Sequence, residues 1–229
     1  MSESVITAFK RCIFIQVLFF LLGGCSLFGI GEKEPGESPE ELMSQGISEF
    51  RDGDYQDAIE AFQKLKDRYP YSTLAIQAQL KMADALFKRK EFEEALALYI
   101  EFEKLHPTNE SIPYTIYQQG RCHFLRMDSI DRDQTSTKDA LKEFERLCKE
   151  FPKNSFCLQA KRHIRKCYSN LAEHEFYVGS FYFKAGHYLA ALRRFEYLIK
   201  HYPDLGLHGK ALNYIARCRD KLAEEKSLL

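Results

Sequence analysis

Four segments of the chain align without gaps, and this internal repeat constrains the fold more than any other feature. Each segment places an alanine, then an aromatic residue four positions later and a proline twelve positions later. The alanines are Ala58, Ala95, Ala140 and Ala191, the aromatic residues are Phe62, Tyr99, Phe144 and Phe195, and the prolines are Pro70, Pro107, Pro152 and Pro203. Such a period indicates a stack of similar structural units, which bury a continuous core only when several of them pack together.

A second set of positions precedes each alanine. A small residue stands twelve positions before it in three units and twenty positions before it in the third, and a phenylalanine follows each small residue by four. These pairs are Gly46 and Phe50, Ala83 and Phe87, Gly120 and Phe124, and Gly179 and Phe183. Small residues let two helices approach closely, and proline ends a helix because it has no amide hydrogen. The wider spacing in the third unit predicts an insertion around residues 128–136.

This pattern resembles the tetratricopeptide repeat, a helix–turn–helix unit. The resemblance implies an all-α superhelical solenoid of about ten helices in four to five repeats. Residues 155–171 have helical periodicity outside the four-unit pattern and predict an added helix, and residues 207–225 predict the last one. Whether these make five repeats or four repeats with end helices stays open. We expect an N-terminal half of two repeats over 39–107 and a C-terminal half over 108–229.

The first 24 residues have the pattern of a signal peptide. Lys10 and Arg11 precede an apolar run over 12–22, which is about half the ~20 residues that a membrane-spanning helix needs. The run ends in Leu22-Gly23-Gly24-Cys25, which resembles the bacterial lipobox. The resemblance implies cleavage between Gly24 and Cys25, a diacylglyceryl group on the thiol of Cys25 and an acyl chain on its amino group. The alternative is a buried apolar segment of a soluble protein.

Residues 25–38 then read as a lipidated, flexible tether rich in Gly, Glu, Pro and Ser, with a reach of roughly 20 Å. Ser26 is not the aspartate that retains enterobacterial lipoproteins at the inner membrane, which favours the periplasmic face of the outer membrane. Residues 25–107 carry a net charge of −7 and residues 108–229 a net charge of +6. The balanced total argues against a nucleic-acid binder, and the split suggests two ends that meet different partners.

The mature chain keeps five cysteines after Cys12 leaves with the signal and Cys25 is acylated. They are Cys122, Cys148, Cys157, Cys167 and Cys218. An odd number in a compartment that permits disulfides leaves at least one thiol free or paired between molecules. Cys148 and Cys157 flank a helix–loop–helix corner and are the best candidate pair, with buried apolar thiols as the alternative.

The sequence offers no pattern that supports catalysis. It has no phosphate-binding glycine loop, no nucleophile elbow and no metalloprotease His–Glu helix. His163 and Cys167 are four residues apart and could share a helix face, but a structural metal site needs four ligands. Glu93 and Glu94 fit a solvated helix face better than acid–base chemistry. We therefore expect a protein that is no enzyme and has neither a metal nor another cofactor.

Binding surfaces are the better prediction. In tetratricopeptide proteins the first helix of each repeat lines a groove, and carrying over those positions predicts a groove that takes an extended or helical peptide. The positions are Met43, Ile47, Phe50, Leu80, Phe87, Tyr117 and Phe124. The alternative is that these side chains pack between repeats. The basic run Lys161–Lys166 is either a solvated face or a patch for an acidic partner.

Two local features resemble the BamD (ComL-like) lipoproteins of the outer-membrane β-barrel assembly machine. One is Asp131-Arg132-Asp133-Gln134-Thr135 in the insertion, which is similar to an Asp-Gln-Thr stretch of the family. The other begins at Leu171-Ala172-Glu173-His174-Glu175 and runs to Tyr202-Pro203. The many cysteines, and Ala185 where family members often have a basic residue, depart from the family pattern.

The resemblance implies a non-catalytic scaffold with two partners. The C-terminal repeats would dock the POTRA domain of the BamA-like insertase, with Arg194 matching a family arginine there and Arg193 beside it. The N-terminal groove would receive unfolded outer-membrane proteins. The alternative is a periplasmic repeat adaptor for cell-envelope or division machinery.

Overall fold

The computed structural model describes residues 37–203 and 205–227, and nearly all of them are helical. The predicted signal peptide, the cleavage site at Gly24 and Cys25, and most of the tether lie outside the described residues. Residues Pro39–Leu229 form one compact unit. Its described helices are α2 (Pro39–Asp52), α3 (Tyr55–Arg68), α4 (Thr73–Lys88), α5 (Phe92–Leu105), α6 (Ile112–Phe124), α7 (Thr135–Glu150), α8 (Ser155–Lys184), α9 (Tyr188–His201) and α10 (His208–Ser227).

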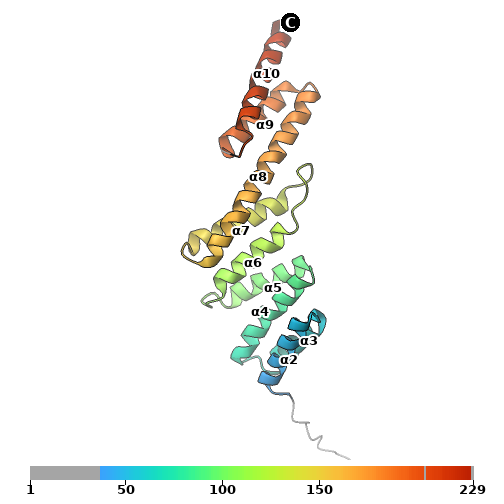
Figure 1. Cartoon of the computed structure of the whole chain (residues 1–229), viewed down its shortest axis with the longest axis vertical. Helices are drawn as coiled ribbons and strands as arrows, with labels where there is room; N and C mark the ends of the chain where they lie inside the picture. Colours follow the sequence, from blue (N-terminus) through green and yellow to red (C-terminus); the bar gives the residue numbers. More distant parts are fainter. Residues whose placement is uncertain (1–36, 204, 228–229) are drawn as a thin grey trace, which may run out of the picture. The chain divides into compact units, whose positions relative to one another are not determined.

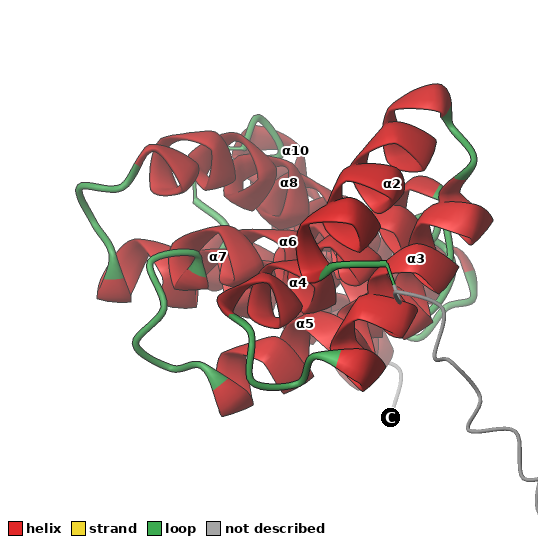
Figure 2. Cartoon of the chain, turned by 90° about the horizontal axis from the view of Figure 1, so that it is seen from below, coloured by secondary structure: helices red, strands yellow, loops and turns green. Residues whose placement is uncertain are grey.

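Consecutive helices pack against each other along the whole unit, as Figure 1 shows from α2 to α10. The pairs α2–α3, α4–α5 and α6–α7 are helical hairpins, and each packs on the first helix of the next (Figure 2). This arrangement confirms the all-α tetratricopeptide-repeat fold. None of the described helices is both long enough and apolar enough to cross a membrane.

The repeated glycines and aromatic residues meet inside the hairpins. A β-carbon added to Gly120 would lie 2.6 Å from the ring of Phe144, and one added to Gly179 would lie 2.9 Å from that of Phe195. A β-carbon added to Gly46 would lie closer still to the ring of Phe62. The three rings are fully buried. The small residues are therefore required because an aromatic ring of the second helix rests directly on the backbone of the first.

The prolines end the second helix of each hairpin in the same way. Helices α3, α5, α7 and α9 each stop two residues before a proline. The residues between, Tyr69, His106, Phe151 and Tyr202, have φ between −127° and −131° and ψ between 54° and 61°. Proline disfavours the α conformation in the residue before it, so one local rule produces the same exit geometry four times.

Helix α8 differs from the expectation. Its 30 residues join the added helix predicted over 155–171 to the first helix of the fourth unit. No proline interrupts this segment and its glycine, Gly179, lies near the C-terminal end, so nothing in the backbone breaks the helix. The described residues consequently form nine helices, and α8 belongs to two units at once.

A disulfide links the end of α7 to the start of α8. It joins Cys148 to Cys157, with their α-carbons 4.8 Å apart, as the favoured pairing predicted. Cys122, Cys167 and Cys218 are free, buried thiols. Burial raises the pKa of Cys122 and of Cys167 to about 12, so both remain protonated at neutral pH.

The insertion that contains one family motif contacts the helix that contains the start of the other. The side-chain amide of Gln134 donates to the carbonyls of Ser129 and Arg132, at 3.0 Å each, and folds the insertion into a compact loop. From α8, Nδ1 of His174 donates to the carbonyl of Ile130 at 2.7 Å. The insertion is thus fastened to the long helix, which gives this pair of motifs a structural role.

Candidate peptide-binding groove

Two hollows lie along the first helices of the N-terminal hairpins. The first is about 390 Å³ and is lined by residues of α2, including Met43 and Ile47, and by Leu74 of α4. The second, which we name the polar hollow, is about 480 Å³ and lies between α2, α4, α5 and α6. Met43 lines both, and Leu80 lines the second. Three of the predicted groove residues are therefore brought together at two adjoining cavities.

The wall of the polar hollow contains a buried carboxylate that the sequence reasoning missed. Asp84 is 7% exposed, and its Oδ1 accepts from the hydroxyls of Tyr99 at 2.8 Å and Tyr114 at 2.5 Å. Lys81 lies 3.2 Å from Oδ2. Gln118 donates to both tyrosine oxygens. The charge of Asp84 is thereby satisfied within the protein, which is the condition for burying it.

Towards this carboxylate, both tyrosine hydroxyls act as hydrogen-bond donors. Burial, followed by the charge of Asp84, raises the pKa of Tyr99 and of Tyr114 well above the ordinary range. Asp84 interrupts the apolar run Met82–Leu86, and a single carboxylate inside such a run is the signal that could have predicted the network.

The remaining predicted groove residues pack inside the protein. Phe87 is 8% exposed and lies edge-on to Phe92, with ring centroids 5.3 Å apart. Tyr117 stacks on Phe156 of α8 at 5.3 Å, so α8 covers this position of the third unit. Phe124 packs against the rings of α7 and α8, and Phe50 is half-buried beside Tyr55. These four positions match the alternative in which the side chains pack between helices.

A second polar network joins the second and third hairpins. Arg146 of α7 donates to both carboxylate oxygens of Glu103 on α5, at 2.6 and 3.0 Å. Gln119 of α6 donates to the same carboxylate at 2.7 Å. The hydrogen bonds from Arg146 hold the pKa of Glu103 below its usual value despite partial burial. This three-helix contact fixes the neighbouring hairpins against each other.

The two arginines predicted to contact an insertase lie on α9. Arg194 forms an ion pair with Glu175 of α8, with 3.0 Å between Nη1 and Oε2. Its side chain is 44% exposed while that of Glu175 is 12% exposed. Arg193 is exposed and lines a shallow hollow with His187 and Glu225. Adjacent residues on a helix point in directions about 100° apart, so the pair presents two different surfaces.

The histidine and cysteine weighed as metal ligands are part of the core. The ring of His163 stacks on Phe144 at 5.0 Å, and its Nε2 lies 3.2 Å from the hydroxyl of Tyr117. Cys167 is fully buried. Across the described ranges, no three His, Cys, Asp or Glu side chains are grouped as metal ligands.

A stack of helical hairpins, with hollows along the first helices, defines a tetratricopeptide-repeat protein. Residues 35–228 match the YfiO family, which is described as outer membrane lipoprotein. Because the match covers nearly the whole chain, the protein belongs to this family.

Several curated relatives are similar over most of their length. The outer membrane protein assembly factor BamD of Vibrio cholerae is 29% identical over 210 residues, which cover 86% of this chain and 87% of the relative. The factor of the same name from Rickettsia prowazekii is 28% identical, over 87% of this chain and 86% of the relative.

Solved structures of repeat domains are also similar. The first tetratricopeptide domain of Spaghetti (RPAP3), bound to an HSP90 peptide, is 25% identical with a TM-score of 0.45 over 58% of this chain and 93% of that one. The domain of P58(IPK) is 16% identical with a TM-score of 0.48 over 80% of this chain and 46% of that one. The fold assignment itself rests on the helix pairing described above.

Proposed function

We propose that this protein is a lipid-anchored, non-catalytic scaffold of the machinery that assembles β-barrel proteins in the outer membrane. The observation that carries the proposal is the family match over residues 35–228, together with relatives named outer membrane protein assembly factor BamD. A non-catalytic role is supported by the polar hollow, where the buried carboxylate of Asp84 is paired with Tyr99, Tyr114 and Lys81.

The anchor is assigned to Cys25, with cleavage after Gly24. A diacylglyceryl group and an N-acyl chain give roughly 0.8 kcal/mol for each buried methylene, which holds a protein firmly at a membrane. Cys25→Ser is expected to move the protein from the membrane pellet to the soluble periplasmic fraction after a high-salt wash. The matched control is Cys12→Ser, which lies in the removed segment and should leave the pellet unchanged. Full retention of Cys25→Ser on washed membranes would remove this assignment.

The peptide site is assigned to the two adjoining hollows at Met43, Ile47 and Leu80. Ile47 is 37% exposed and Tyr71 is fully exposed, so both accept a photo-crosslinking residue without disturbing the core. A crosslinker at Ile47 is expected to capture unfolded outer-membrane protein in membranes across which newly made outer-membrane proteins are being translocated. The same group at Tyr71 serves as the control, and equal capture at both positions would contradict a specific groove.

The docking site for the insertase POTRA domain is assigned to Arg193 and Arg194. Their reversal, Arg193→Glu or Arg194→Glu, is expected to weaken pull-down of the insertase, because an exposed interface charge is replaced by its opposite. Lys200→Glu changes the same helix by the same charge and is the control. Glu175→Gln frees Arg194 from its ion pair and should leave pull-down intact. Unchanged pull-down in both arginine variants, with helical content retained, would overturn the assignment.

Crosslinked affinity purification from native membranes tests the function as a whole. Recovery of an outer-membrane barrel insertase with the wild-type protein is the expected result. Recovery of envelope or division proteins without any barrel protein would instead identify a periplasmic adaptor.

A further inference from the structure

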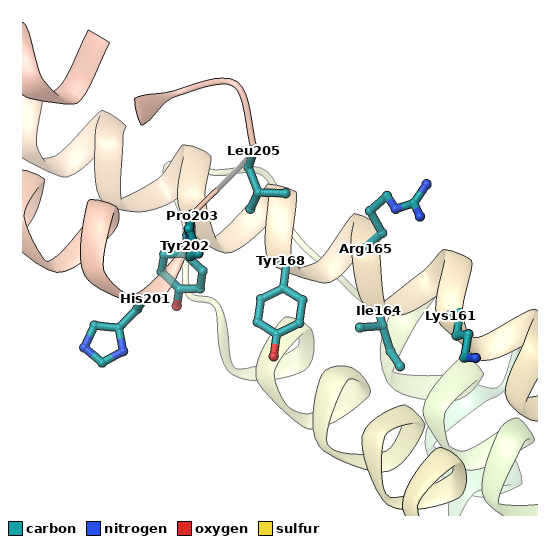
Figure 3. A pocket seen from close by; sticks show the side chains of 8 residues that line it. All are labelled: Lys161, Ile164, Arg165, Tyr168, His201, Tyr202, Pro203 and Leu205. Atoms are coloured by element: carbon teal, nitrogen blue, oxygen red, sulfur yellow. The ribbon is translucent and has the colours of Figure 1, made fainter. Parts of the chain in front are cut away.

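A third hollow, which we name the basic hollow, lies between α8 and the segment that follows α9 (Figure 3). It has a volume of about 550 Å³. One wall is a single face of α8 formed by Lys161, Ile164, Arg165 and Tyr168, and the other wall comes from residues 201–203 and 205. The spacing of three, four and seven residues places the four α8 side chains in one stripe along the helix.

The inner part of the basic hollow is aromatic and apolar. The rings of Tyr168 and Tyr202 meet edge to face with centroids 6.2 Å apart, and the ring of Tyr197, which is outside the lining, lies 6.0 Å from that of Tyr202. Ile164 and Leu205 add aliphatic surface on either side of Tyr168 (Figure 3). Such a floor accepts an apolar or aromatic side chain.

The α8 wall is basic, and no carboxylate of residues 37–203 or 205–227 forms an ion pair with it. The chain has no aspartate or glutamate from residue 151 to residue 172, whereas this stretch has Lys153, Lys161, Arg162, Arg165 and Lys166. The last four are exposed and form no ion pair within the described part of the chain. Two pairs of them are four residues apart, where like charges destabilise a helix. The fold keeps this charge at a cost in helix stability.

Two carboxylates of α7 and α8 already have partners of their own. Glu145 of α7 accepts from the hydroxyl of Tyr168 at 2.5 Å. Glu175, further along α8, is held by Arg194 at 3.0 Å. Neither carboxylate pairs with Lys161 or Arg165, which leaves these two cations available to a partner.

We propose that the basic hollow binds an extended acidic peptide segment of a partner protein. Two carboxylates placed two residues apart pair with Lys161 and Arg165, and an aromatic side chain two residues further along packs against Tyr168 and Tyr202. Charge complementarity favours an acidic partner, and the aromatic floor of the hollow favours an aromatic side chain in that partner. A flat membrane surface satisfies the cations but does not fill the hollow.

The dimensions of helix and strand support this pairing. Lys161 and Arg165 are about 6 Å apart along the helix axis, and Lys161 and Tyr168 about 10 Å, at 1.5 Å per residue. Side chains on one face of an extended peptide repeat about every 7 Å. A segment with the spacing Glu-x-Glu-x-Phe spans about 14 Å from its first to its last side chain, so it matches the stripe in order, and the long side chains of Lys161 and Arg165 cover the difference of about 4 Å. The basic hollow contains none of the residues assigned to the peptide groove or to the insertase contact, so this proposal does not depend on them.

The test uses the full chain, purified from membranes in detergent, and two fluorescein-labelled peptides, Glu-Ser-Glu-Ser-Phe and its reverse order. Fluorescence anisotropy of the wild type is expected to show saturable binding of one of them that weakens as salt is added. The double variant Lys161→Glu with Arg165→Glu is expected to weaken binding at least about tenfold. The matched control is Arg162→Glu with Lys166→Glu, which makes the same charge change on the neighbouring face and should weaken binding by less than about threefold.

Replacement of the peptide's phenylalanine by serine is expected to weaken binding about fivefold or more, because the aromatic floor loses its contact. Equal loss in the two double variants would mean general attraction to a basic protein and would overturn the proposal. Absence of binding by the wild type would also overturn it. If the peptides do not bind but the Lys161 and Arg165 variant alone loses affinity for vesicles containing 30% phosphatidylglycerol, the surface faces a membrane and the peptide assignment is wrong.

Discussion

The polar hollow and the basic hollow are of similar size but treat charge in opposite ways. In the polar hollow, Asp84 is buried, accepts hydrogen bonds from two tyrosine hydroxyls and forms an ion pair with Lys81. In the basic hollow, Lys161 and Arg165 are exposed and have no carboxylate partner among the described residues. The comparison separates a charge that holds the protein together from charges that remain available for binding.

The difference follows from what desolvation requires. A carboxylate removed from water must have its hydrogen-bonding capacity filled, so the groups around Asp84 are tightly specified. Exposed ammonium and guanidinium groups keep their water and impose no such demand. We therefore expect substitutions at the first site to affect folding and those at the second to affect binding.

The largest effect is expected from Asp84→Ala. The buried hydroxyl of Tyr99 and the partly buried hydroxyl of Tyr114 would lose their acceptor, so the free energy of unfolding should fall by roughly 2–4 kcal/mol in urea titrations. Asp84→Asn retains an acceptor and is the control, with a smaller loss. A change in Asp84→Ala below about 0.5 kcal/mol, as at an ordinary surface position, would place Asp84 in the same category as Arg165.

The disulfide at the start of α8 should contribute less. Cys148→Ser opens a loop of about ten residues, for which the chain-entropy relation gives a loss of roughly 2–3 kcal/mol. Urea unfolding of the wild type in dithiothreitol should reproduce the variant, and the reductant should not change the variant further. A wild type that is equally stable with and without reductant would show that packing alone positions the start of α8.

The third prediction concerns His163, which lies within the basic run Lys161–Lys166 but has a partly buried side chain. Burial, helped by Arg121, lowers its pKa below the ordinary value, so the unfolded chain binds its proton more readily than the folded one. The wild type should therefore keep its full stability above about pH 6.5 and lose stability as the pH falls below it, by at most about 1.4 kcal/mol per pH unit.

Urea midpoints at pH 7.5 and 5.5 measure this effect. His163→Gln has no titrating group at this position and should show a smaller difference between the two values. His123, whose pKa burial also lowers, is present in both proteins and cancels in the comparison. An identical difference in the two proteins would mean that His163 does not titrate in this range.

The smallest effect on stability is expected from the exposed lysine of the basic hollow, Lys161. Lys161→Glu replaces a like-charge pair with Arg165 by a glutamate four residues before an arginine, which should raise the free energy of unfolding by about 0.2–0.5 kcal/mol. Thermal unfolding followed by circular dichroism, with Lys161→Gln as the neutral control, measures it. A loss of stability would show that Lys161 has a structural partner and would weaken the contrast between the hollows.

The repeat made the fold predictable because its rules are local. Alanine, aromatic residue and proline recur at fixed spacing, and each rule acts within one hairpin: Phe144 rests on Gly120, and Phe151 takes its conformation from Pro152. Residue spacing alone also identified the Cys148–Cys157 corner. Helix α8 was divided in the prediction because a periodic pattern records which face is apolar and does not record whether two patterns belong to one helix.

The candidate sites were less predictable. Three of seven groove positions line the hollows, whereas Tyr117 and Phe124 are covered by α8, from residues more than 30 positions later. The partners of Asp84 come from three helices, and the basic hollow needs residues 201–203 and 205 opposite the α8 stripe that contains Lys161. No local pattern specifies which distant helix covers a given face.

The amino-acid sequence by itself determined the unit of this protein, its length, the places where helices cross and end, and the family to which the chain belongs. The tertiary structure alone decided which apolar faces stay open, which carboxylate is buried with its partners, and which cations have no carboxylate partner in the described part of the chain. The physical reason is range: helix periodicity and proline act over a few residues, whereas burial and ion pairing depend on segments that meet only after the hairpins have stacked.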